Sequence, residues 1–319
     1  MGWFGRKRSD GKDNAATPGA EGADSSLTFF SVDEAAQFRA LVREVAAERG
    51  REVTVHADHI VDDAGNVFGL WNVAALCAGE SDGAWRGLVD THVDHLFNPQ
   101  GPDVATMDLE ALMASVHARL VEEDSLRSFD DLDAYSLEEW APGVRRILAV
   151  DTPTTVLTPA LDHLKARAPL ATLIDQGWRN TRSLLDTEPL SAERVEHDGR
   201  WFTCLLGDSF FTASLALMLS DVAARFEPEA VQEHGIIFAI PYRHQLAFRV
   251  ATDAEAALAG LMLIPRFAAN CFSESPGPIS PCTFHWRDGV VSCLTEMDGQ
   301  GQLTVRPGPY LERLLSELG

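Results

Sequence analysis

Two short polar segments interrupt the most apolar part of the sequence. Gly207-Asp208-Ser209, followed by Thr212, stands where a β-prone run gives way to a helical pattern, and Arg243-His244 follows Pro241 between two apolar runs. The residue types are those of a helix cap at Asp208 and a tight turn at residues 241–244. Strand ends and helix starts at one sheet edge also converge in layered folds. If the chain binds a small ligand, we predict the site at Asp208, Thr212, Arg243 and His244.

Two histidine groups have the composition of a metal site but not its geometry. On a strand, His56 and Asp58 would face one side and His59 the other. His92 and His95 lie three apart on a predicted helix, but His92 falls on the apolar face. We predict no bound metal.

Neither the cysteines nor any of the common catalytic or nucleotide-binding motifs indicates a reaction. The five cysteines contain no CxxC pair, and the sequence leaves open whether three of them come together: Cys271, Cys282 and Cys293. No GxSxG, GxxxxGK[ST] or GxGxxG motif occurs. We predict no cofactor and no catalytic residue, and the sequence leans away from an enzyme.

The elements that must position the site form a strand, helix, strand, strand unit. Residues 201–206 predict a strand, 209–226 a helix that Pro228 ends, and 236–240 and 246–250 two further strands. This unit is the expected core of a larger C-terminal α+β domain, residues 144–319.

That domain is expected to contain a mixed or antiparallel sheet. Asp253 can cap a helix that Pro265 must kink or end. Residues 282–286, 290–296 and 302–305 predict a C-terminal β-meander with Asp288-Gly289 in its first turn.

An N-terminal α-β-β-α-α domain is predicted over residues 27–122. Ser31 and Glu34 form a capping box before a helix that runs to Gly50. A hairpin of residues 52–61 and 67–71 follows, then helices at residues 85–96 and 109–120. The densely acidic residues 123–143 are expected to be a linker.

The charge balance limits the partners. Lys and Arg number 26 against 48 Asp and Glu, for a formal net charge of −22, while 45% of the residues are apolar. Such a surface repels phosphates, so we expect no nucleic acid partner. A basic protein would be steered towards it.

Residues 1–26 are expected to form a disordered tail. The tail offers a weak alternative contact with a membrane surface, through two aromatic and three basic residues: Trp3, Phe4, Arg6, Lys7 and Arg8. No run of eighteen apolar residues and no secretory signal are found, which predicts a cytoplasmic protein without a transmembrane segment.

Several segments together resemble the YtpQ-like family of bacterial cytosolic proteins, a domain of unknown function. They are WRNTRSL at residues 178–184, GDSFFTAS at 207–214, IIFAIPYRHQLAF at 236–248 and a strand-turn-strand at 283–291. The resemblance spans most of residues 35–295 and implies no activity. The family pattern has carboxylates where this chain has Thr212 and His244, which implies that any acidic site is altered here.

Two hypotheses of function follow. The first is a non-catalytic protein-binding module, of a chaperone-like, adaptor or immunity type, whose acidic surface binds a basic partner. The second is an enzyme or small-ligand-binding protein with a pocket near Asp208 and Arg243-His244. The second predicts a concave site and a shifted histidine pKa there.

Overall fold

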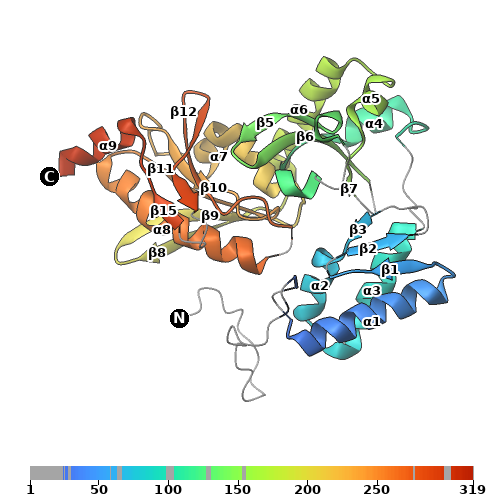
Figure 1. The fold of residues 1–319 in the computed structure, drawn as a ribbon. Helices are drawn as coiled ribbons and strands as arrows, with labels where there is room; N and C mark the ends of the chain where they lie inside the picture. The colour runs from blue at the N-terminus through green and yellow to red at the C-terminus, as the bar shows by residue number, and fades with distance from the viewer. Residues whose placement is uncertain are drawn as a thin grey trace. The chain divides into compact units, whose positions relative to one another are not determined.

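The computed structural model describes residues 24, 26–27, 30–57, 59–62, 67–97, 104–126, 131–152, 156–275, 277–297 and 303–318. The chain forms two compact units, Met1–Val93 and Asp94–Gly319. Helices combine with sheets whose described strand pairs are all antiparallel, which confirms the α+β class (Figure 1). The aromatic and basic residues of the predicted tail contact lie outside the described residues.

The first unit places helices against a small sheet. Its elements are α1 (Val32–Glu48), β1 (Val53–Val55), β2 (His59–Asp62), β3 (Val67–Gly69), α2 (Trp71–Ala78) and α3 (Asp82–Phe97), with the strands in the order β1-β2-β3. The Ser31–Glu34 capping box is present. The buried rings of Phe30, Phe38 and Trp85 lie 5.0 to 6.4 Å apart and form the centre of the core.

The predicted first strand of the hairpin is in fact two strands. The backbone N–H of His56 donates to the carbonyl of His59 at 2.8 Å, so the chain turns between β1 and β2. The two imidazoles stack with their centroids 4.5 Å apart. The expectation that they face opposite sides of one strand is therefore wrong, because a turn breaks the alternation of side chains.

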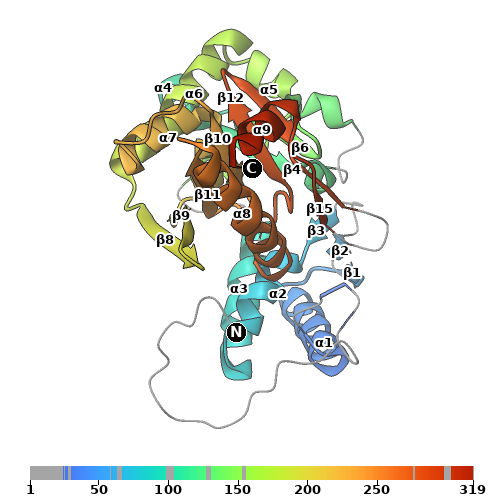
Figure 2. The same cartoon turned by 90° about the vertical axis from the view of Figure 1, so that its left-hand side faces the viewer.

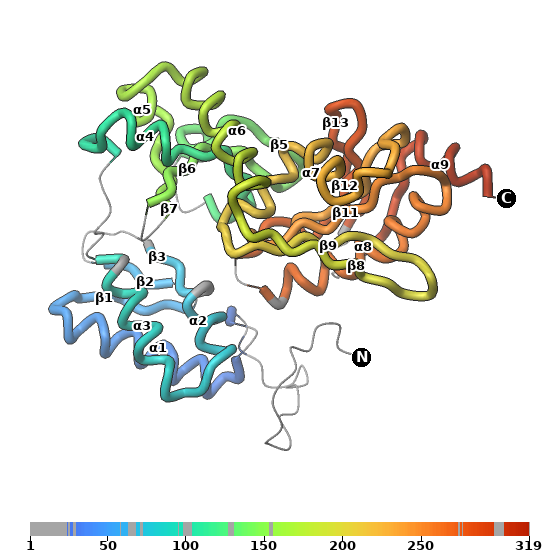
Figure 3. Tube along the Cα trace, turned by 180° about the vertical axis from the view of Figure 1, so that it is seen from behind, coloured from blue at the N-terminus to red at the C-terminus, as the bar shows by residue number. Residues whose placement is uncertain are grey.

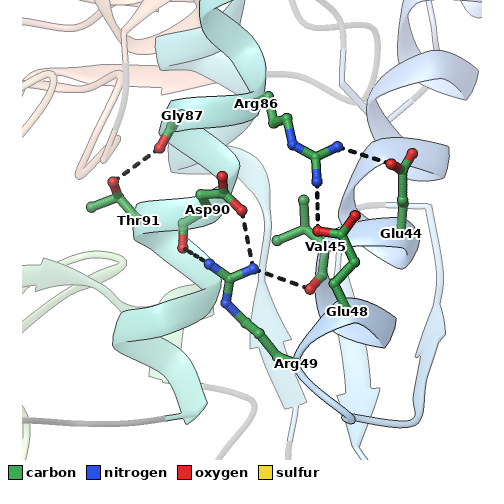
Figure 4. Close-up of polar contacts among 8 residues, drawn as sticks. All are labelled: Glu44, Val45, Glu48, Arg49, Arg86, Gly87, Asp90 and Thr91. Carbon is green, nitrogen blue, oxygen red and sulfur yellow. Dashed lines mark hydrogen bonds and ion pairs between the residues drawn. The ribbon is translucent and has the colours of Figure 1, made fainter.

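Polar contacts join α1 to α3 (Figure 4). Arg86 of α3 donates to Glu44 at 2.8 Å and to Glu48 at 2.5 Å, both on α1. Arg49, at the end of α1, donates to the carboxylate of Asp90 at 3.0 Å. Each of these arginines thus has a carboxylate partner.

The described residues of the second unit form three sheets. The first has the order β4 (Val116–Glu122), β6 (Val144–Asp151), β5 (Ser136–Ala141), with β7 (Val156–Leu157) also paired to β6. The largest has the order β13 (Val290–Cys293), β12 (Thr283–Arg287), β10 (Ile236–Ala239), β11 (Gln245–Val250), β9 (Arg200–Leu206), β8 (Ser191–His197). The last pairs β14 (Thr295–Met297) with β15 (Leu303–Val305).

Helices cover both larger sheets. One side of the six-stranded sheet packs against α8 (Ala254–Glu274) and α9 (Pro309–Leu315) (Figure 2). Its other side shares a core with η3 (Thr212–Met218), α7 (Leu219–Phe226) and the β4-β6-β5 sheet. That smaller sheet packs against α4 (Leu109–Ser115), α5 (Leu161–Lys165) and α6 (Leu170–Thr187). The short helices η1 (Glu123–Leu126), η2 (Leu132–Ala134) and η4 (Ser316–Leu318) complete the unit.

Three local expectations differ from the structure. The helix expected through Leu120 ends at Ser115, because residues 116–122 pair with β6. The acidic residues 123–143 contain η1, η2 and β5, and β5 pairs with β6, so they lie inside the second unit; the structure divides the chain at Val93 instead. The C-terminal strands form two separate hairpins rather than one meander, since β13 pairs with β12 and β14 with β15.

Helix α8 continues across Pro265 to Glu274. Within the described part of the chain, its residues Ala254–Ser273 are the one helical segment long and apolar enough to cross a membrane. A core helix of a soluble protein passes the same test. Here Ala257, Ile264 and Ala268 are buried against the six-stranded sheet.

Candidate ligand-binding site

An open hollow lies where β9 ends. It measures about 400 Å³. Its walls combine polar and apolar groups from the start of β8, the end of β9 and the β10–β11 turn: Pro189, Ser191, Leu206, Gly207, Asp208, Tyr242 and His244. Two of the four predicted site residues, Asp208 and His244, therefore line one concave surface.

The backbone of Gly207 joins the strand end to the turn. Leu206 of β9 is the register partner of Gln245 of β11, and the Gly207 N–H donates to the carbonyl of His244 at 3.2 Å. A Cβ atom at Gly207 would lie 2.6 Å from Thr212 Oγ1 and 2.8 Å from a methyl group of Leu190. The close approach of these segments requires glycine there.

The imidazole of His244 is fixed by hydrogen bonds at both nitrogens. Nδ1 donates to the carbonyl of Gly207 at 3.1 Å, because Nε2 accepts from Nε of Arg243 at 3.0 Å. Burial, and then the charge of Arg243, lowers the pKa of His244 below its ordinary value. The ring is therefore a neutral spacer that fixes the Arg243 side chain.

Asp208 and Thr212 do not have the roles that their spacing suggested. Helix η3 begins after Phe211, and no side chain caps its first turn, so the prediction of an Asp208 cap is wrong. The exposed Asp208 lies at the hollow instead. Thr212 is buried, and its hydroxyl donates to the carbonyl of Ser209 at 2.9 Å. Thr212 supports the turn and does not line the hollow.

Arg243 lies beside the hollow without lining it. Its Cζ atom is 4.3 Å from the ring centroid of Phe210, a cation–π contact. Its backbone is fixed on two sides, because its N–H donates to Gly277 and its carbonyl accepts from Ala213. Burial lowers the pKa of the guanidinium.

Sequence reasoning missed the other polar residues of this region. Ser191 and Tyr242 line the hollow, and Arg119 of β4 lies close enough to Arg243 for the two charges to repel. Arg119 was assigned to a helix that the structure replaces with a strand. One signal was available, since Arg119 is the only charged residue within the apolar run of residues 116–121.

The structure brings two cysteines together elsewhere. Cys282 lies just before β12 and Cys293 on β13, and a hydrogen bond from the Cys293 thiol holds the pKa of Cys282 below its ordinary value. Among the described residues, no three His, Cys, Asp or Glu side chains are grouped as metal ligands.

No family model, no curated protein and no solved structure matches the chain. The resemblance to the YtpQ-like family remains a prediction from the segments quoted above.

Proposed function

We propose that the protein is a non-catalytic binding protein that holds a small ligand in the hollow at the end of β9. The observation that carries the proposal is the convergence of Ser191, Asp208, Tyr242 and His244 on one concave surface. Sites of this kind combine apolar walls with a few convergent polar groups. Here Pro189 and Leu206 supply the apolar part of the wall.

The hydrogen bonds of His244 and of the adjacent hydroxyl groups support a binding role over catalysis by these residues. A general base needs a nitrogen or oxygen free to take a proton. Both ring nitrogens of His244 are occupied by Gly207 and Arg243. The hydroxyl of Ser209 accepts from the N–H of Phe211, and the hydroxyl of Thr212 donates to Ser209. These groups hold the turn in place.

A variant that fills the hollow tests this proposal. Ser191 lies at the hollow, while Ala192 is the next residue on the same exposed edge strand and points to the other face of the sheet. The native protein, Ser191→Phe and Ala192→Phe are purified from the host, and the small molecules released on denaturation are identified by mass spectrometry. A compound retained by the native protein and Ala192→Phe, and lost from Ser191→Phe, supports the site. A compound retained equally by all three, or none in any, contradicts it.

A second candidate function is the binding of a basic protein. Strand β8 forms one edge of the six-stranded sheet beside β9 (Figure 3), and its side chains are exposed except for Val195. An exposed edge can pair with an extended segment of a partner. Glu193 and Glu196 add negative charge to this edge.

Affinity purification at low and high salt tests the second candidate. A basic partner that is lost as salt rises, and lost from the double variant Glu193→Lys, Glu196→Lys, would support it. A variant with reversed charges that keeps every partner contradicts it.

A further inference from the structure

Two arginines from different parts of the second unit meet at a pair of adjacent rings. The Cζ atom of Arg119, on β4, lies 5.9 Å from the ring centroid of Phe211. The Cζ atom of Arg243, in the β10–β11 turn, lies 4.3 Å from the centroid of Phe210. Burial, and then the charge of Arg243, lowers the pKa of Arg119 to about 10. Both side chains therefore remain charged at neutral pH.

Neither arginine has a carboxylate within ion-pair distance in the described part of the chain. The Nε atom of Arg119 is fully buried and has no hydrogen-bond partner. Arg243 uses one donor, Nε, on the neutral imidazole of His244. The carboxylate of Asp151, an exposed residue, acts on Arg119 through space without forming an ion pair. The two guanidinium groups thus lie close together without an ion-pair partner among the described residues.

The register of the β4-β6-β5 sheet explains why Arg119 points inward. Arg119 lies opposite Ile147 and His117 opposite Ala149, so these four side chains share one face. That face packs in the core with Phe211, and the His117 ring stacks on Phe211 at 4.5 Å. The register of β4 with β6 therefore places the charged side chain of Arg119 in a partly buried position.

We propose that Arg119 and Arg243 bind a small oxyanion, a carboxylate or a phosphate group, at the surface beside Phe210. Guanidinium groups present paired N–H donors that match the oxygens of both groups. A partly buried cation without a partner is destabilising, and an anion would supply the missing charge. Phe210 is 37% exposed, so the ligand can reach the site from solvent.

The charge of the rest of the molecule selects for small anions. The chain carries a net charge of −22, so an extended polyanion such as nucleic acid is repelled wherever it leaves the pair. The site adjoins the hollow through the hydrogen bond between Arg243 and His244, but its rings belong to another part of the core. Phe211 belongs to the core shared with the smaller sheet, whereas Leu206 of the hollow packs on the α8 side.

Titration of the whole protein with inorganic phosphate and with acetate, in a chloride buffer that contains no other oxyanion, tests the proposal by calorimetry. We expect saturable binding of at least one anion. Arg119→Met and Arg243→Met should each weaken it about tenfold or more, since each removes a charged hydrogen-bond donor. Arg119→Lys keeps the charge but not the forked donors and should weaken it less.

One matched variant completes the experiment. Arg225→Met, on α7, removes one positive charge, one cation–π contact with Phe226 at 5.5 Å and the ion pair with Asp186 at 2.7 Å. It should bind as the native protein does. Saturation by phosphate alone indicates a phosphate-bearing ligand, and saturation by acetate alone a carboxylate. The proposal is overturned if neither anion saturates the native protein, or if Arg225→Met loses as much affinity as Arg119→Met.

Discussion

The arginines that join α1 to α3 in the first unit and Arg119 in the second unit differ in how their charge is balanced. Between α1 and α3, Arg49 reaches Asp90 at 3.0 Å and Arg86 reaches Glu44 at 2.8 Å (Figure 4). In the second unit, Arg119 forms no ion pair with any described residue, although its Nε atom is fully buried. In the first unit, Arg49 and Arg86 each have a carboxylate partner. In the second unit, Arg119 has none among the described residues, although part of its guanidinium group is fully buried.

This difference is local and does not reflect a shortage of acids. The chain has 48 acidic residues for 26 basic ones. On β6, the strand next to Arg119, Arg145 donates to Glu123 at 2.7 Å. Arg249 on β11 contacts the buried Glu227 at 3.3 Å. The fold pairs arginines on both sheets around Arg119 and Arg243, so the absence of a carboxylate at that pair marks it as a position for an external anion.

Removing a paired arginine from the first unit should have the largest effect on stability. Arg39 forms two hydrogen bonds with the carboxylate of Asp24, at 2.8 and 2.9 Å, and both side chains are largely buried. Arg39→Met leaves that carboxylate without its cation. We expect the free energy of unfolding at pH 7 to fall by about 2 kcal/mol, measured by urea denaturation with circular dichroism. Arg43→Met, exposed on the same helix, is the control.

The pH dependence of the stability of Arg39→Met tests whether the lost ion pair with Asp24 causes the destabilisation. The hydrogen bond from Arg39 is the main reason that the pKa of Asp24 lies well below its usual range. A carboxyl with a depressed folded pKa stabilises the fold above its unfolded pKa of about 4, and the contribution is lost as pH falls below that value. The gap between native protein and Arg39→Met should therefore narrow below about pH 4. A gap that stays constant there would show that lost packing, not lost charge pairing, causes the effect.

Replacing Arg119 should increase the free energy of unfolding, whereas replacing Arg39 decreases it. Replacement of an unpaired, partly buried cation by an apolar side chain of similar length removes a desolvation cost. In a buffer without oxyanions, Arg119→Met should raise the free energy of unfolding by about 1 kcal/mol. Arg145→Met, on the neighbouring strand, should lower it, because Glu123 loses its partner. If Arg119→Met proved less stable than the native protein, the fold itself would already satisfy that charge.

Local signals predicted much of the fold. The Ser31 capping box, the Asp253 cap and the Asp288-Gly289 turn, both residues of which have positive φ, depend only on neighbouring residues, and the structure confirms all three. The strands predicted at residues 201–206, 236–240 and 246–250 are also confirmed, as β9, β10 and β11.

Pairing between strands that are distant in the sequence could not be predicted from such local signals. Residues 109–120 carry apolar side chains at helical spacing, which predicts a helix. The helix nevertheless ends before Val116 and a strand begins there, because residues 116–122 form seven register pairs with β6, nearly thirty residues away. Arg119 therefore could not be placed beside Arg243 from the sequence. Asp208 and His244 could, because each borders a strand that its own apolar run predicts, and the ends of neighbouring strands meet at one sheet edge.

The titration of His244 reports on the charge of Arg243. Burial and the neighbouring guanidinium hold the pKa of His244 below its ordinary value of about 6.5. Because the unfolded chain binds the proton more readily, this group's contribution to stability is present above pH 6.5 and declines as pH falls towards the folded pKa. In NMR titrations, Arg243→Met should raise the pKa of His244, while burial still keeps it under 6.5. An unchanged pKa would mean that the Arg243 charge is already neutralised.

The smallest effect is expected at the most exposed pair. Arg86 and its partners Glu44 and Glu48 are each roughly half exposed, so water and salt screen their attraction. Arg86→Met should leave the urea midpoint unchanged within error at about 0.15 M salt, despite removing two short hydrogen bonds. This variant separates burial from the number of partners: Arg86 has two carboxylates and Arg39 one. If Arg86→Met destabilised the protein as much as Arg39→Met, the number of carboxylate partners, and not burial, would determine the loss of stability. The expected destabilising effect of Arg119 could then not be explained by its burial.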